Sequence, residues 1–200
     1  QWLLDEQWLQ PGSLASAVDL VQREGWAGLG LDNEIKGPAN AHDKDVSPDW
    51  DPRLPQRFAA FVGNLSAALT LHGKQLVACV TSTWHGDLGG PEYLPRYAQA
   101  APSMRFMDMG TYYNTYPNGY TMPETIQNFS RMLGGGTQQL ALGVGATEQP
   151  GHENASKIDY RWNSTAFSAF VAEAELAGVN EIDVWRMDID GAPKGSTGET

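Results

Sequence analysis

Helical and strand-like patterns of hydrophobic residues alternate along the chain. Apolar side chains at helical spacing predict five helices, at residues 13–25, 58–73, 92–101, 122–133 and 167–178. Ser13 is the expected N-cap of the first helix, and Gly25 is expected to end it. Nearly continuous apolar runs predict five strands, at residues 28–34, 75–82, 104–112, 138–144 and 181–188.

Strands of this apolar kind, separated by amphipathic helices, are typical of a parallel sheet covered by helices. Two α/β architectures fit. One is an open, five-stranded, doubly wound sheet. The other is a (β/α)₈ TIM barrel, which needs eight strands and about 250 residues. The number of strands favours the open sheet, whereas the distribution of polar groups favours the barrel. One domain is expected over residues 1–190, followed by a flexible Gly/Ser/Thr-rich tail or linker at 191–200.

The composition and the net charge indicate which classes of partner the chain is not expected to bind. Hydrophobic residues make up 41% of the 200 residues, which is enough for a core, and the net charge is −11. A chain of this charge repels phosphate backbones and anionic lipid, so nucleic acid and membranes are not expected partners. No apolar run approaches the roughly 18 residues of a membrane span.

Four Asn-x-Ser/Thr sequons are present, more than the single one that chance predicts. They begin at Asn64, Asn128, Asn154 and Asn163. Two interpretations remain open: an accidental excess, or a glycoprotein that is secreted or exposed at the cell surface.

The expected C-terminal ends of the strands are rich in polar and aromatic side chains, and this is where parallel α/β folds carry their sites. Asp32 and Glu34 are two residues apart on a strand, so both point to the same face. Two carboxyls so close cannot both ionise cheaply, and the raised pKa of one would suit a general acid. Aromatic rings at neighbouring strand ends suit a sugar ring. Alternatively, the two carboxyls cap a loop or bind an ion.

No cofactor is expected. No glycine-rich loop lies between a strand and a promptly following helix, and the four histidines lack metal-ligand spacing. The acidic loop with Asp43, Asp45, Asp49 and Asp51 could hold Ca²⁺, but solvated charge is the preferred interpretation. No metal site is therefore predicted.

Three segments at predicted strands have a familiar pattern: Gly25-Trp26-Ala27-Gly28-Leu29-Gly30-Leu31-Asp32-Asn33-Glu34, Asp108-Met109-Gly110-Thr111-Tyr112-Tyr113-Asn114 and Val179-Asn180-Glu181-Ile182-Asp183-Val184-Trp185. In this order they resemble the fourth, sixth and eighth barrel strands of glycoside hydrolase family eighteen, the chitinases and endo-β-N-acetylglucosaminidases. The resemblance implies a TIM barrel of which this chain carries strands four to eight. The other three strands would come from a preceding segment or from other chains.

The resemblance also implies roles for single residues in a substrate-assisted hydrolysis. Glu34 would be the acid, Asp32 would orient the acetamido group of the sugar, and Tyr112 would hydrogen-bond the acetamido oxygen. Trp185 would stack under the sugar. Four further residues are expected to bind substrate: Trp84, Tyr113, Asn114 and Arg186.

Four positions depart from the family pattern. Ala27 and Gly30 stand where the family has its first two aspartates, Asn33 replaces an aromatic residue, and Tyr113 replaces an aspartate. The acid and its nearest partner remain, but the shell that supports them does not. Two functions therefore stay open: a secreted glycosidase acting on N-acetylglucosamine-containing glycans, or a non-catalytic carbohydrate-binding or structural glycoprotein with the same fold.

Overall fold

The protein is described by a computed structural model that covers residues 3–10, 12–33, 35–38, 46–80, 86–108, 122–134, 139–145 and 164–185. Five strands are present: β1 Gly28–Leu31, β2 Gln75–Val80, β3 Arg105–Asp108, β4 Leu140–Gly145 and β5 Ile182–Trp185. The α-helices are α1 Ser13–Arg23, α2 Leu54–Thr70, α3 Leu94–Ala100, α4 Met122–Met132 and α5 Ser164–Leu176. A short 3₁₀ helix, η1 Gln7–Leu9, precedes them.

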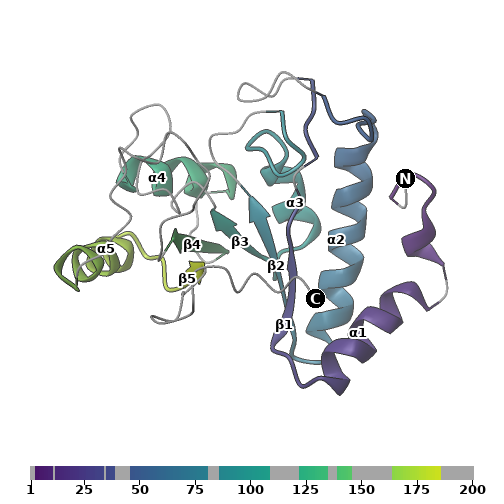
Figure 1. Ribbon diagram of the computed structural model, residues 1–200, viewed down its shortest axis with the longest axis horizontal. Helices are drawn as coiled ribbons and strands as arrows, with labels where there is room; N and C mark the ends of the chain where they lie inside the picture. The colour runs from purple at the N-terminus through teal and green to yellow at the C-terminus, as the bar shows by residue number, and fades with distance from the viewer. Residues whose placement is uncertain are drawn as a thin grey trace, which may run out of the picture.

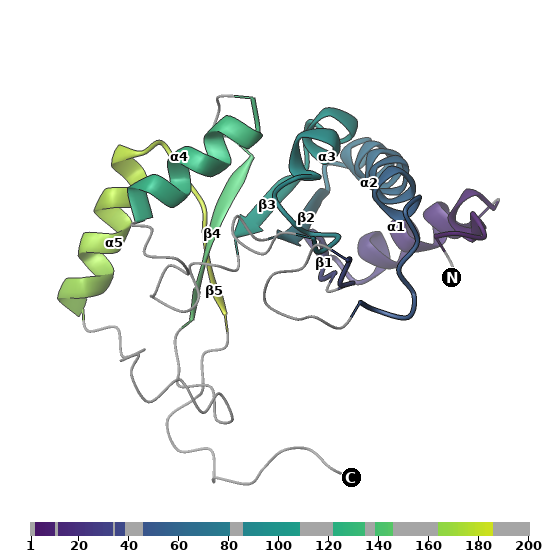
Figure 2. The ribbon, with the colours of Figure 1, turned by 90° about the horizontal axis from the view of Figure 1, so that it is seen from above.

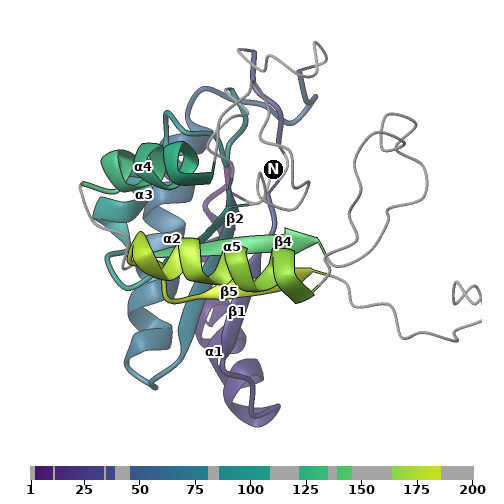
Figure 3. The same cartoon turned by 90° about the vertical axis from the view of Figure 1, so that its left-hand side faces the viewer.

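The five strands form one parallel sheet whose spatial order is the order of the chain, β1-β2-β3-β4-β5. The helices lie on one side of this sheet, with α1 packed beside α2 (Figures 1 and 2). The sheet twists and curls so strongly that β4 and β5 run across the direction of β1 and β2 (Figure 3). A doubly wound sheet would reverse its strand order and carry helices on both faces. The partial barrel is therefore confirmed, and the open doubly wound alternative is wrong.

Helix α2 shows how the hydrophobic pattern builds the fold. Phe58, Val62, Leu65 and Leu69 are buried, as their spacing predicts. The helix begins at Leu54, four residues before the predicted start, because Pro55 in the first turn has a backbone angle already suited to a helix.

Just before α2, Asp51 and Arg53 form a bidentate ion pair. Arg53 donates to both carboxylate oxygens of Asp51, at 2.9 and 2.8 Å, and its backbone N–H donates to the same side chain at 2.8 Å. These hydrogen bonds lower the pKa of Asp51 to about 2. Asp51 thus stays charged and fixes the turn that leads into the helix.

The start of α1 differs from the prediction. Gly12 occupies the N-cap position with φ of 93°, and Ser13 is the first helical residue. The Ser13 hydroxyl donates instead to the carbonyl of Gln7, at 2.9 Å, which ties α1 to η1. Ser13 as the N-cap is therefore wrong, because its hydroxyl has a partner in the preceding turn. Gly25, with φ of 69°, follows the end of the helix as predicted.

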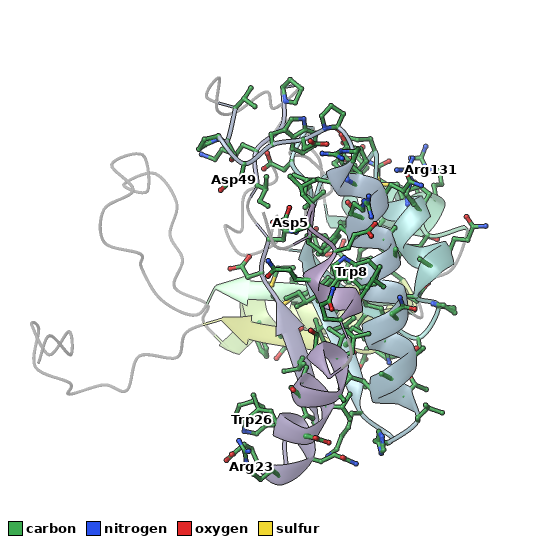
Figure 4. The ribbon with its side chains drawn as sticks, turned by 90° about the vertical axis from the view of Figure 1, so that its right-hand side faces the viewer. Asp5, Trp8, Arg23, Trp26, Asp49 and Arg131 are labelled. Carbon is green, nitrogen blue, oxygen red and sulfur yellow. The ribbon has the colours of Figure 1, made fainter. Side chains whose placement is uncertain are left out.

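A run of aromatic rings joins η1 to the loop after β1. Trp8 is buried against α2, with its ring 6.0 Å from that of Phe61 (Figure 4). The run continues through Phe58, Tyr97 and Tyr93 to Trp50, with centroid separations of 5.0 to 6.4 Å. Tyr97 is fully buried and donates to the carbonyl of Leu88 at 2.7 Å.

Candidate functional site

The strand register divides the sheet into two faces, since side chains alternate along each strand. Leu76, Ala78, Val80, Phe106 and Leu140 lie on the helix-covered side and belong to the large core. Residues of the opposite phase form what we call the concave face: Gly30, Val77, Cys79, Met107, Ala141, Gly143 and Asp183. Met107 and Ala141 pack there in a second, smaller cluster with Val77 and Cys79.

Asp32 follows β1 directly and has the same phase as Gly30, which places it at the C-terminal end of the concave face. Its side chain is exposed. The space next to Gly30 is open, because a Cβ added at residue 30 would meet no atom within 4 Å. The aspartate for which Gly30 substitutes in the resembling family would thus fit here.

The lower part of the concave face carries an ion pair that the sequence did not predict. Arg105 of β3 lies 3.1 Å from Glu181, just before β5, measured from Nε to Oε2. Glu181 is in phase with Asp183 on β5, so the pair reaches across β4 near Ala141. The spacing of residues 181, 183 and 185 was the available signal, because alternation puts all three on one face.

Asp183 is a partly buried acid on the same face, beside Gly143 of β4. Burial raises its pKa above the ordinary carboxyl value. Gly143 is buried and has no side chain, so Asp183 has no side-chain partner from that residue. Sequence reasoning included Asp183 only as part of a motif and did not place it on the concave face.

Two loops meet at the C-terminal end of β1 and β2. The loop after β1 includes Asp49, and it lies at the end of the sheet opposite to Arg23 and Trp26 (Figure 4). Lys36 forms an isolated antiparallel bridge with Asp87 of the loop after β2. This joined pair of loops borders the position of Asp32.

Most of the predicted site residues lie outside the part of the chain that the structure describes. Those outside the described residues are Glu34, Trp84, Tyr112, Tyr113, Asn114 and Arg186. Trp185 is the last residue of β5 and pairs with Gly145, and only its backbone is described. The predicted meeting of Asp32, Glu34, Tyr112 and Trp185 at one end of the sheet remains a prediction. The tail at 191–200 also lies outside the described part.

Two of the four sequons are described. Asn64 is exposed on α2, although Val62 and Leu65 beside it are buried. Asn128, on α4, is partly buried, and its side-chain oxygen accepts a hydrogen bond from Arg131. Asn154 and Asn163 lie outside the described residues.

No group of three or more His, Cys, Asp or Glu side chains suited to a metal ion occurs in the described ranges. Among the helices that the structure describes, none combines the length and apolar character needed to cross a lipid bilayer.

The described part of the concave face offers carboxyl groups, small residues and apolar side chains.

No protein-family model matches the sequence, and no curated protein matches it. Solved structures do match its fold. A chitinase from Chromobacterium violaceum aligns with a TM-score of 0.56 and 13% identity, over 89% of this chain and 67% of that one. The spore cortex-lytic enzyme SleL of Bacillus megaterium gives 0.58 and 11%, over 94% and 52%. The chitinase ChiW of a Paenibacillus species gives 0.60 and 14%, over 90% and 29%.

These likenesses show a fold of the chitinase type. The chain therefore has the partial (β/α) barrel of chitinases and related glycosylases, as the sequence resemblance implied. It spans about half of the SleL structure and about two thirds of the Chromobacterium chitinase.

Proposed function

We propose that this chain forms part of a secreted or cell-surface glycosidase that hydrolyses N-acetylglucosamine-containing glycans by substrate assistance. One observation carries the proposal: Asp32 directly follows β1 at the end of the concave face. The sheet is parallel, sequentially ordered and covered by helices on its other face, with the fold of chitinases. In such folds the C-terminal strand ends hold the active site.

In this mechanism Glu34 donates a proton to the glycosidic oxygen, and the sugar's own acetamido oxygen attacks the anomeric carbon. Asp32 accepts the acetamido N–H and stabilises the cyclic oxazolinium as positive charge develops. Tyr112 donates to the acetamido oxygen, and Trp185 forms an apolar floor for the sugar ring. Water then opens the oxazolinium and restores the acetamido group.

Four more residues complete the proposed carbohydrate site. Their side chains supply stacking surfaces, hydrogen bonds and one positive charge for the neighbouring sugars: Trp84, Tyr113, Asn114 and Arg186. The mechanism needs no cofactor or metal, because the substrate supplies the nucleophile. Further β/α units, from the same polypeptide or from other chains, would complete the sheet beyond β1 and β5.

Glu34→Gln tests the proposal in the natural protein with its complete sheet. The amide keeps the shape of the side chain but has no proton to transfer, so turnover of chitooligosaccharides should fall by a factor of about 100 to 10,000. Binding of the same sugars should persist. Glu24→Gln is the matched control, because Glu24 lies just after α1 at the opposite end of the sheet and pairs with Arg23. The proposal fails if wild type releases no sugar between pH 4 and 8.

Tyr112 needs its own test, since a second tyrosine follows it. Tyr112→Phe removes one hydrogen bond to the acetamido oxygen, so kcat should drop about a hundredfold. Tyr113→Phe is the matched control and should change mainly the KM. The reverse result would move the assigned role to Tyr113.

One observation favours a second function, a carbohydrate-binding protein without catalysis. Residue 30 is glycine, and no atom lies within 4 Å of where its Cβ would be. Asp32 therefore lacks the acidic partner that the resembling family has at position 30. Without that partner the proton balance of the site changes. In this case wild type and Glu34→Gln would be equally inactive and would bind chitooligosaccharides equally well.

A further inference from the structure

The residues directly after Glu34 are held by hydrogen bonds from their own loop. The Lys36 backbone N–H donates to the hydroxyl oxygen of Ser47 at 2.8 Å. The Ser47 backbone N–H donates back to the Lys36 carbonyl at 2.9 Å. This reciprocal pair joins two positions eleven residues apart, and it leaves neither backbone group of Lys36 without a partner.

The loop after β2 holds the same segment from another side. The Gly37 N–H donates to the Gly86 carbonyl, and the Leu88 N–H donates to the Ile35 carbonyl, both at 2.9 Å. Gly86 is held in turn, because its own N–H donates to Glu92 Oε1 at 2.5 Å. Charge on the acceptor strengthens a bond of this kind.

Close packing fixes the segment further. Gly37 is buried, and a Cβ at that position would lie 2.2 Å from the Gly86 carbonyl oxygen and 2.8 Å from the Trp50 ring. Only glycine allows two loops and an indole ring to come this close. Residues 35–37 are therefore held by hydrogen bonds on two sides and by an aromatic ring.

We propose that Ser47 is a positioning residue for Glu34, acting with the loop at residues 86–88 as a clamp on residues 35–37. The inference rests on the proposed function, because it assigns Glu34 a proton to deliver. The clamp fixes residues 35–37, which directly follow the proposed acid in the sequence. A general acid that is displaced by about 1 Å can lose a hundredfold in rate. Ser47 does not touch the substrate.

Ser47→Ala in the complete natural protein tests the clamp. It removes the acceptor for the Lys36 N–H, so kcat on chitooligosaccharides should fall about tenfold while KM changes less than twofold. Ser47→Thr keeps a hydroxyl oxygen and should restore kcat to within about twofold of wild type. Hydrogen exchange of the Lys36 amide, which needs no catalysis, should speed up at least tenfold in Ser47→Ala.

Ser13→Ala is the matched control. It also removes one serine hydroxyl bonded to a backbone group, but at the start of α1, far from the clamp in the sequence. Its kcat and its Lys36 exchange should equal those of wild type. The inference is overturned if Ser47→Ala keeps full kcat, if threonine fails to restore it, or if Lys36 exchange is unchanged. An inactive wild type would overturn the proposed function and the catalytic part of this inference together, and the exchange measurement would still decide whether the clamp exists.

Discussion

The two faces of the sheet differ in what their side chains do. The helix-covered face carries large apolar residues such as Leu76, Phe106 and Leu140, all essentially inaccessible to solvent. The concave face carries small residues, a short apolar cluster, the Arg105–Glu181 ion pair and two further acids. One face carries the large apolar core and the other carries small, acidic and ion-paired side chains, although both come from the same strands.

Adjacent residues of β2 test this contrast most strongly. Leu76→Ala removes a fully buried side chain from the helix-covered face, so the free energy of unfolding should fall by about 3 kcal/mol. Val77→Ala, its neighbour on the concave face, removes a half-buried side chain and should cost about 1 kcal/mol. Urea denaturation measures both. Equal losses would mean that the two faces contribute alike to stability.

Gly30→Asp tests whether the concave face gains activity when the aspartate of the resembling family is restored at position 30. The space around residue 30 accepts a side chain, and the new carboxyl would share a proton with Asp32. If the protein is an enzyme, kcat/KM should rise about tenfold, equivalent to about 1.4 kcal/mol of transition-state stabilisation. Gly30→Asn is the control, with the same shape but no carboxyl. A gain that asparagine reproduces would argue against proton sharing.

Asp183 should make the stability of the concave face depend on pH. Burial raises its pKa, so the folded protein favours the protonated form. This contribution is present at pH values below the ordinary carboxyl pKa and is lost as the pH rises through the raised pKa. Asp183→Asn should therefore be more stable than wild type at pH 7, by less than about 1 kcal/mol because the carboxyl is only partly buried.

The gain from Asp183→Asn should vanish near pH 3, and melting curves at the two pH values measure it. Asp19→Asn, an exposed change on α1, is the control and should show no such difference. A gain of equal size at both pH values would assign the effect to something other than ionisation.

The smallest effect is expected on the solvent side of the helical layer. Asn64 is exposed, whereas the Asn128 side chain is engaged by Arg131, so in a secretory host Asn64 should carry the fuller glycan occupancy. Asn64→Gln should remove one glycan from the intact mass and leave the melting temperature within about 1 °C. Native material whose mass is unchanged by deglycosylation would remove the sequon argument for secretion.

The hydrophobic pattern predicted the order and type of the five strands and five α-helices that the structure describes. It succeeded because residues such as Val62, Leu65 and Leu69 repeat at the spacing of a buried helical face. Periodicity alone could not distinguish an open sheet from a barrel, since both use buried parallel strands. The polar strand ends and the short resembling motifs supported the barrel.

The parts of the site that sequence reasoning missed depend on contacts between distant residues. Ser47 lies in a polar loop with no periodic signal, and its partner Lys36 is eleven positions away. Arg105 and Glu181 are 76 positions apart, and only the register of three strands brings them together. The Ser13 error has the same origin, because the Gln7 carbonyl competes for its hydroxyl.

The order of the strands in the sheet also bears on how the protein is made. Each strand pairs with the one that preceded it in the chain, and within the described residues one α-helix lies between each pair. On a ribosome, each new β/α unit would therefore find its neighbour already synthesised, and the sheet can grow in one direction without waiting for later residues. Nascent chains that end after β2, β3 or β4 should show stepwise increases in protease resistance, because folding built on local contacts proceeds early.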